Sequence, residues 1–67
     1  MGNIYFKLLV LFRDNDIWSR KNLLHSIKNE KLIDDALSLG YIKQYDINDI
    51  GEPRYCITEL GKKIRDN

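Results

Sequence analysis

Hydrophobic positions repeat at helical spacing along the first two thirds of this chain. This spacing predicts three helices: residues 3–12, Arg20 to Ile27, and Glu30 to Leu39. Ser19 and Asn29 stand directly before the second and third of these helices, where a polar side chain can cap the first turn. Gly40 follows the third helix, and a glycine at this position typically ends a helix in left-handed backbone.

The last third of the chain predicts a β-hairpin followed by a helix. Tyr41 to Ile47 and Arg54 to Ile57 are rich in aromatic and β-branched side chains, as strands are. The turn formers of Asn48 to Pro53 lie between these two stretches. Thr58 can cap a short C-terminal helix, and Glu59 in the first turn suits the helix dipole.

The first predicted helix is apolar on nearly all sides. Four of its side chains share one face: Ile4, Leu8, Leu11 and Phe12. Three others point largely the other way: Phe6, Leu9 and Val10. In so small a domain the second face needs a cover. Two alternatives for covering this face stay open. One is a homodimer interface through Phe6, Leu9 and Val10, and the other is packing by the chain's own C-terminal segment.

Two short stretches carry a resemblance to a known family. They are Leu39-Gly40-Tyr41-Ile42 and Tyr55-Cys56-Ile57-Thr58-Glu59-Leu60-Gly61. With the order of the predicted elements, they make the chain similar to a winged helix-turn-helix domain. The resemblance implies one domain over residues 1–67, of an α+β but mostly α fold: a three-helix bundle, a β-hairpin wing and a short C-terminal helix. Such domains are mostly transcriptional regulators that bind double-stranded DNA, although some winged helices bind only proteins.

The family pattern assigns roles to residues of this sequence. The second helix would cross the DNA backbone, so the resemblance places phosphates near Arg20, Lys21 and Lys28, with Arg54 contributing from the wing. The third helix would face the major groove. Its outward side chains are Lys31, Asp34, Asp35 and Ser38. The lysines of the second helix have an alternative role as an ordinary solvated helix face.

The charge on this surface opposes simple DNA binding. The third helix carries one cation, Lys31, against three carboxylates: Glu30, Asp34 and Asp35. The wing sets Arg54 against Asp46, Asp49 and Glu52. DNA affinity depends on neutralising phosphates, so acidic groups lower it. A second hypothesis therefore stays open: a protein-binding winged helix whose acidic face, formed by Glu30, Asp34, Asp35, Asp49 and Glu52, meets a basic partner.

Composition limits the remaining classes. The chain has 67 residues, of which 43% are hydrophobic and 31% charged, as in a folded globular domain. The formal net charge of +1 gives no overall basic excess. The run from Leu8 to Phe12 is too short to span a membrane. The single cysteine, Cys56, excludes an internal disulfide and a cysteine-based zinc site, and a reducing cytoplasm is the expected location.

No motif predicts an enzyme. His25 is the only histidine, and no nucleophile or metal-ligand spacing accompanies it. Asp34 and Asp35 are adjacent on a helix and point about 100° apart, so they cannot share a proton. The sequence therefore predicts no catalytic residue, no metal and no cofactor.

Overall fold

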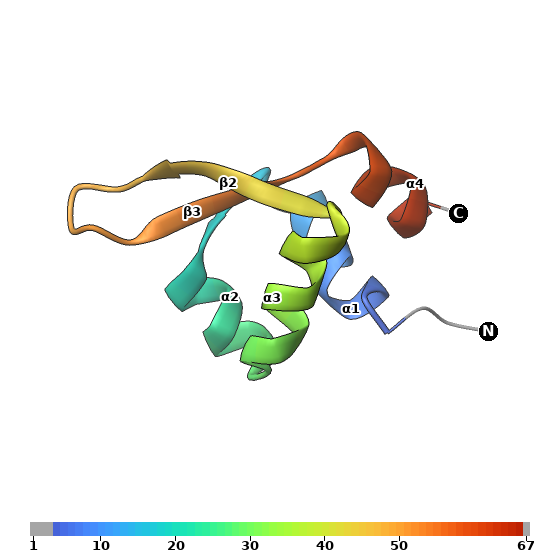
Figure 1. The fold of residues 1–67 in the computed structure, drawn as a ribbon, viewed down its shortest axis with the longest axis horizontal. Coiled ribbons are helices and arrows are strands. Elements are labelled where there is room, and N and C mark those ends of the chain that lie inside the picture. Colours follow the sequence, from blue (N-terminus) through green and yellow to red (C-terminus); the bar gives the residue numbers. More distant parts are fainter. Residues whose placement is uncertain (1–3, 67) are drawn as a thin grey trace.

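Helices and strands are interleaved along the chain. The computed structural model describes residues 4–66, and Figure 1 shows their arrangement. The elements follow one another in this order: α1 (Phe6–Leu9), the 3-10 helix η1 (Val10–Arg13), β1 (Ile17–Ser19), α2 (Arg20–Ile27), α3 (Glu30–Leu39), β2 (Ile42–Ile47), β3 (Pro53–Ile57) and α4 (Glu59–Asp66). In this part of the chain, four α-helices and a three-stranded antiparallel sheet form a small α+β domain.

The predicted first helix is one α-helical turn that tightens into η1. Asn3, its predicted start, lies outside the described residues. Leu8 and Leu9 are completely buried and Phe12 is 1% exposed, whereas Ile4 is 69% exposed. The buried face of this first helical segment therefore includes Leu9 and does not include Ile4. Of the two covers that the sequence left open, the chain's own C-terminal segment is present, because α4 packs against α1.

A third strand adds to the predicted hairpin. In β1, Ile17 pairs with Cys56 and Trp18 with Tyr55, which makes β3 the central strand of the order β1-β3-β2. The Trp18 indole N–H donates to the carbonyl oxygens of Leu11 and Asn15, each at 3.1 Å, and so fixes the chain between η1 and β1. A three-residue strand is too short to show alternation. Its pairing depends on a partner far along the chain.

The hairpin of β2 and β3 ends in a closed loop. The Asn48 side-chain oxygen accepts from the backbone N–H groups of Ile50 at 3.1 Å and Glu52 at 2.9 Å. Gly51 completes the turn with a φ of +84°, a conformation that glycine adopts at no steric cost. Pro53 begins β3 opposite Ile47, beyond the last residue that pairs with β1. Its missing N–H therefore removes no bond of the ladder to β1.

The two sequence stretches that carry the resemblance meet in space. The Thr58 hydroxyl donates to the carbonyl oxygen of Gly40, and the Thr58 backbone N–H donates to that of Tyr41 at 3.0 Å. The same hydroxyl oxygen accepts the N–H of Gly61 at 3.0 Å, which confirms Thr58 as the cap of α4. Gly40 has a φ of +80°, as predicted for the glycine that ends α3. These residues join the end of α3, the start of β2 and the start of α4.

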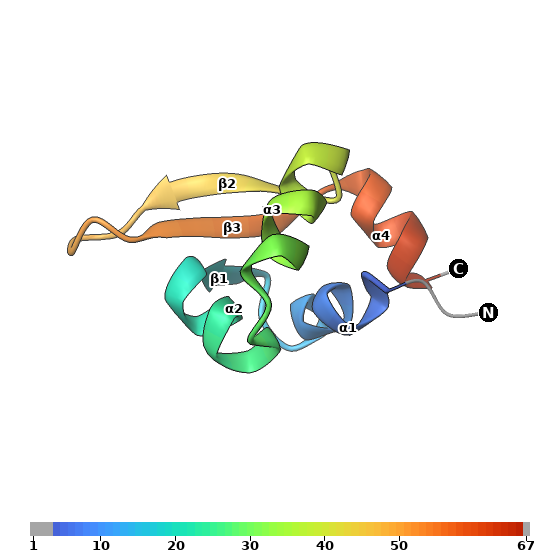
Figure 2. The same ribbon diagram turned by 60° about the horizontal axis from the view of Figure 1, so that its bottom comes forward.

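One hydrophobic core holds the elements together. Its most completely buried large side chains come from five elements: Phe12, Leu8, Leu9, Leu23, Ile33 and Ile42. Tyr55 of β3, 3% exposed, extends this core to the sheet. Figure 2 shows the hairpin projecting past α2, while α1 and α4 lie together at the other end of the molecule. The hairpin end is therefore the part of the domain least covered by helices.

Candidate nucleic-acid interface

The second and third helices meet at a two-residue corner. Both predicted N-caps are confirmed, since the Ser19 side chain accepts from the Asn22 N–H at 3.2 Å and the Asn29 side chain from the Leu32 N–H at 3.1 Å. Lys28 ends α2 in left-handed backbone, with a φ of +57°. A left-handed residue reverses the chain direction within one position, so α3 follows α2 directly. The corner exposes the Lys28 side chain.

Arg20, a predicted phosphate contact, is engaged inside the domain. Its guanidinium donates to the Tyr55 hydroxyl at 3.1 Å, to Asp34 at 2.9 Å and to Glu30 at 3.1 Å. The side chain is only 24% exposed. These contacts, the bond to the Tyr55 hydroxyl first, raise the pKa of Arg20 above its ordinary value, although burial acts in the opposite direction. Arg20 thus links α2 to α3 and to β3.

The outward face of α3 is largely paired with itself and with Arg20. Lys31 contacts Asp35 at 3.1 Å, one turn further along the helix. With Asp34 and Glu30 held by Arg20, the cluster contains two cations and three carboxylates. The acidic excess predicted for this helix is therefore reduced from two charges to one. Ser38 is exposed further along the same helix.

Arg54, the predicted cation of the wing, is also paired. Its Nε donates to Asp46 at 2.6 Å, and Nη2 donates to the other oxygen of the same carboxylate. The guanidinium lies 5.9 Å from the centre of the Tyr45 ring. The hydrogen bond from Arg54 lowers the pKa of Asp46 below its ordinary value. Among residues 4–66, Asp49 and Glu52 form no ion pair, so the loop end of the hairpin stays acidic.

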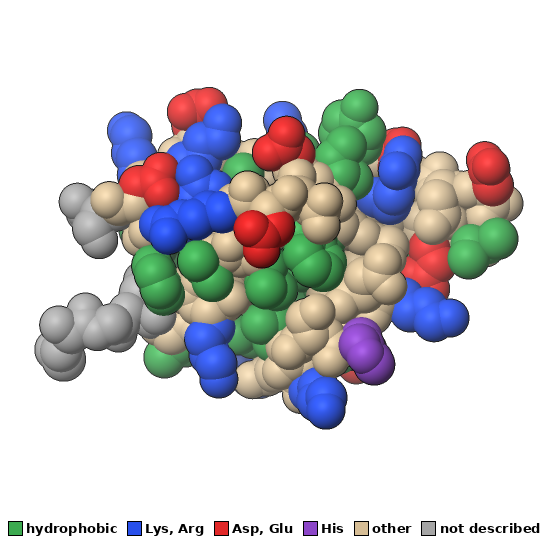
Figure 3. Space-filling model, turned by 180° about the vertical axis from the view of Figure 1, so that it is seen from behind, with side chains coloured by type: hydrophobic (Ala, Val, Ile, Leu, Met, Phe, Trp, Pro, Cys, Tyr) green, Lys and Arg blue, Asp and Glu red, His purple; other side chains and the backbone are tan. Residues whose placement is uncertain are grey.

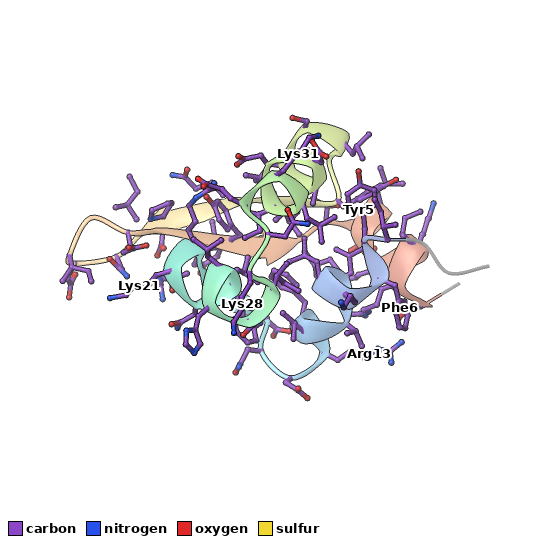
Figure 4. All side chains as sticks on the ribbon, turned by 90° about the horizontal axis from the view of Figure 1, so that it is seen from below. Tyr5, Phe6, Arg13, Lys21, Lys28 and Lys31 are labelled. Carbon is purple, nitrogen blue, oxygen red and sulfur yellow. The ribbon has the colours of Figure 1, made fainter. Side chains whose placement is uncertain are left out.

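A stripe of unpaired basic side chains runs along the outside of α2. Lys21 and His25 are four residues apart on one face of α2, Lys28 follows at the left-handed C-cap, and all three are exposed. Within the described part of the chain none of them forms an ion pair. Figure 4 shows Lys21 and Lys28 at the two ends of α2, with Lys31 away from both on α3. We call these three residues the α2 stripe.

A shallow hollow accompanies the α2 stripe. Its volume is about 450 Å³, and it is lined by Lys21, Asn22, Leu24 and His25. The half-buried Leu24 supplies an apolar surface between the basic side chains. The sequence indicates the lysines but not this hollow, because Leu24 has the spacing of an ordinary core position in an amphipathic helix.

The rest of the surface carries mixed charge. Figure 3 shows lysine and arginine side chains at several separate places, interspersed with aspartate and glutamate. At the C-terminal end, Arg65 lies 2.8 Å and Arg13 3.5 Å from Asp66. No wide basic patch is therefore formed on that face, whereas the side chains of the α2 stripe form no ion pair among residues 4–66.

The predicted dimer residues lie in three different environments. Leu9 is completely buried within its own domain, so its prediction as an interface residue is wrong. The helical wheel misplaced it because the short α1 turns both Leu8 and Leu9 inward. Phe6 is 43% exposed, with the Arg13 guanidinium 6.0 Å from the centre of its ring, and Val10 is half-buried.

Two further properties of residues 4–66 concern metal binding and membrane spanning. No group of three or more His, Cys, Asp or Glu side chains in this range could hold a metal ion. None of its helices has the length and apolar character needed to cross a membrane. Comparisons with protein-family models, with curated proteins and with solved structures found no match.

Proposed function

We propose that this chain is a winged helix-turn-helix domain that binds double-stranded DNA as a transcriptional regulator. Two local features support the proposal: the tight corner that joins α2 to α3, and the two-stranded hairpin that extends beyond these helices. In this arrangement α2 crosses the phosphate backbone, α3 faces the major groove and the hairpin serves as the wing.

The α2 stripe is the observation that carries the proposal. Lys21 and Lys28 need break no ion pair within the described residues before they contact phosphates. Arg20 and Arg54 would first have to leave Asp34, Glu30 and Asp46. Phosphate contacts fix position and supply most non-specific affinity. Binding would therefore begin at the two lysines and be modest in strength.

Base contacts would come from α3. Asp34 and Asp35 can accept a hydrogen bond from the N4 amino group of cytosine, and Lys31 can donate to guanine. Each of these groups would exchange an internal partner for a base edge. Specific recognition by α3 would therefore require a DNA sequence whose base contacts compensate for the lost internal contacts. Non-specific binding would depend on the α2 stripe.

The test is a fluorescence anisotropy titration with a random DNA duplex. With two phosphates neutralised, the logarithm of the binding constant should fall against the logarithm of salt with a slope of about −2. The double variant Lys21→Gln with Lys28→Gln should remove most of this slope. Lys63→Gln is the matched control, because Lys63 is an exposed helical lysine away from α2. Undetectable binding at about 50 mM salt, or an equal loss in the control, would refute the proposal.

A second candidate is a protein-binding winged helix. It is favoured by the net negative charge of the α3 cluster and by Asp49 and Glu52 of the hairpin, which form no ion pair within residues 4–66. A basic protein partner would meet this face, and charge complementarity would mainly speed its association. In a pull-down, the double variant Asp34→Lys with Asp35→Lys should lose such a partner. Unchanged capture would exclude this face.

A further inference from the structure

The end of the hairpin presents exposed apolar side chains on a fixed loop. Ile50 is 80% exposed and Ile47 is 60% exposed. The Asn48 side chain closes this loop through two backbone hydrogen bonds. Ile50 is thus held outward before any partner arrives, which lowers the entropy lost on binding. We call residues 47–52 the arm tip.

The charge of the arm tip disfavours contact with DNA phosphates. Asp49 and Glu52 form no ion pair among the described residues, and Asp46 already holds Arg54. Two carboxylates beside an apolar anchor would be repelled by phosphates. The arm tip instead fits a surface that offers an apolar recess with basic side chains around it.

The α2 stripe and its hollow have this chemistry. Leu24 supplies the apolar wall, Lys21 and His25 line the same hollow, and the exposed Lys28 follows at the C-cap of α2. The arm tip of the same copy projects away from α2 past the helical body (Figure 2). The arm tip and Lys21 nevertheless lie towards the same end of the molecule (Figure 4). Two copies can therefore approach each other so that the arm tip of each copy lies over α2 of the other copy.

We propose that two copies of this chain form a reciprocal dimer in which each arm tip covers the partner's α2 stripe. Ile50 of one copy packs on Leu24 of the other, and Asp49 and Glu52 face Lys21 and Lys28. A two-fold axis makes both contacts equivalent and closes the assembly at two copies. The contact is small, so the dimer forms reversibly at high protein concentration.

This dimer has a consequence for the proposed DNA binding. It covers Lys21 and Lys28, the two lysines that would meet phosphates, so dimerisation and DNA binding exclude each other. The dimer itself does not rest on the proposed function, because it is measured without DNA. If the dimer is not observed, the proposed DNA binding is not refuted, and if DNA binding is not observed, the dimer is not refuted.

Sedimentation equilibrium of the full chain, without DNA, tests the dimer. The expected mass rises from one copy to two with protein concentration and falls back when salt is added, because the exposed charge pairs are screened. Ile50→Ser should raise the dissociation constant roughly ten- to a hundredfold, as expected for losing one buried isoleucine. Since Ile50 is 80% exposed, this change leaves the fold of each copy intact.

Charge reversal identifies the two surfaces independently. The pair Asp49→Lys with Glu52→Lys should be monomeric, and so should the pair Lys21→Glu with Lys28→Glu. Mixed together, these two double variants should restore association, since each arm tip then meets an oppositely charged stripe on the other copy. Lys63→Glu is the control and should dimerise like the parent.

Several outcomes would overturn the dimer: a parent chain that stays monomeric, an Ile50→Ser variant that dimerises unchanged, or charge-reversed variants that fail to associate when mixed. Assemblies of the parent chain that grow beyond two copies would equally contradict reciprocal closure.

Discussion

Gly61 is the position where one added carbon should do the most damage. A Cβ built there would lie 2.0 Å from the carbonyl oxygen of Tyr41 and 2.7 Å from Cγ1 of Ile57. The Tyr41 oxygen cannot move aside easily, because it is backbone and accepts hydrogen bonds from the Thr58 N–H and hydroxyl, each at 3.0 Å. In Gly61→Ala, α4 must therefore shift away from the start of β2.

The size of the effect follows from these contacts. Overpacking a well-filled site costs about 1–3 kcal/mol, and each strained or lost hydrogen bond at Thr58 costs about 1 kcal/mol. Alanine's better helix propensity offsets up to about 1 kcal/mol. The net loss is about 2–3 kcal/mol, out of about 3–10 kcal/mol expected for a domain of this size. The melting temperature should fall by roughly 10–20 °C.

Thermal and urea unfolding followed by circular dichroism measure this loss. Lys63→Ala is the matched control, because Lys63 is exposed two residues further along the same helix. It should leave the melting temperature nearly unchanged. A Gly61→Ala variant as stable as the parent, or more stable, would show that α4 does not pack on Tyr41 as described.

Three further changes test other parts of the structure. Gly40→Ala forces a side chain into left-handed backbone at a φ of +80°, and urea unfolding should show a loss of about 1 kcal/mol although no atom lies within 4 Å of the new Cβ. Arg20→Gln breaks the link from α2 to α3 and β3 and should cost about 1–2 kcal/mol, whereas Lys31→Gln, which breaks an exposed pair, should cost less than about 0.5 kcal/mol; equal losses would contradict the central role of Arg20. Because Arg54 lowers the pKa of Asp46, this pair stabilises the fold fully above the ordinary aspartate pKa of about 3.9 and loses that contribution as pH falls through the lower folded value. Urea midpoints at pH 7 and at about pH 2 should therefore differ less in Asp46→Asn than in the parent, and an unchanged difference would refute the assignment.

The charge arrangement explains why the candidate site was only partly predictable. Arg20 and Arg54 were predicted to be available to phosphates, but both are engaged by carboxylates of their own domain. The partners of Arg20 include Tyr55, 35 residues away along the chain. A charge count along the sequence contains no information on such pairings. The sequence did identify the lysines of the α2 stripe. It did not show that, among the predicted phosphate-binding cations, only these two form no ion pair within the described residues.

The sequence by itself determined the features that depend on neighbouring residues. The caps at Ser19 and Asn29, the glycine stop at Gly40 and the hairpin with its closing turn all follow from contacts a few positions apart. These signals are local, and the backbone responds to them whatever the rest of the chain does.

Tertiary structure decided the rest. It made Ile17–Ser19 a third strand by pairing it with β3, turned Leu9 into the core, and joined Gly61 to Tyr41. It also engaged Arg20 and Arg54 while leaving Lys21 and Lys28 unpaired among the described residues. Each of these outcomes needs segments distant along the chain to meet, and only the packed fold sets which side chains share a surface.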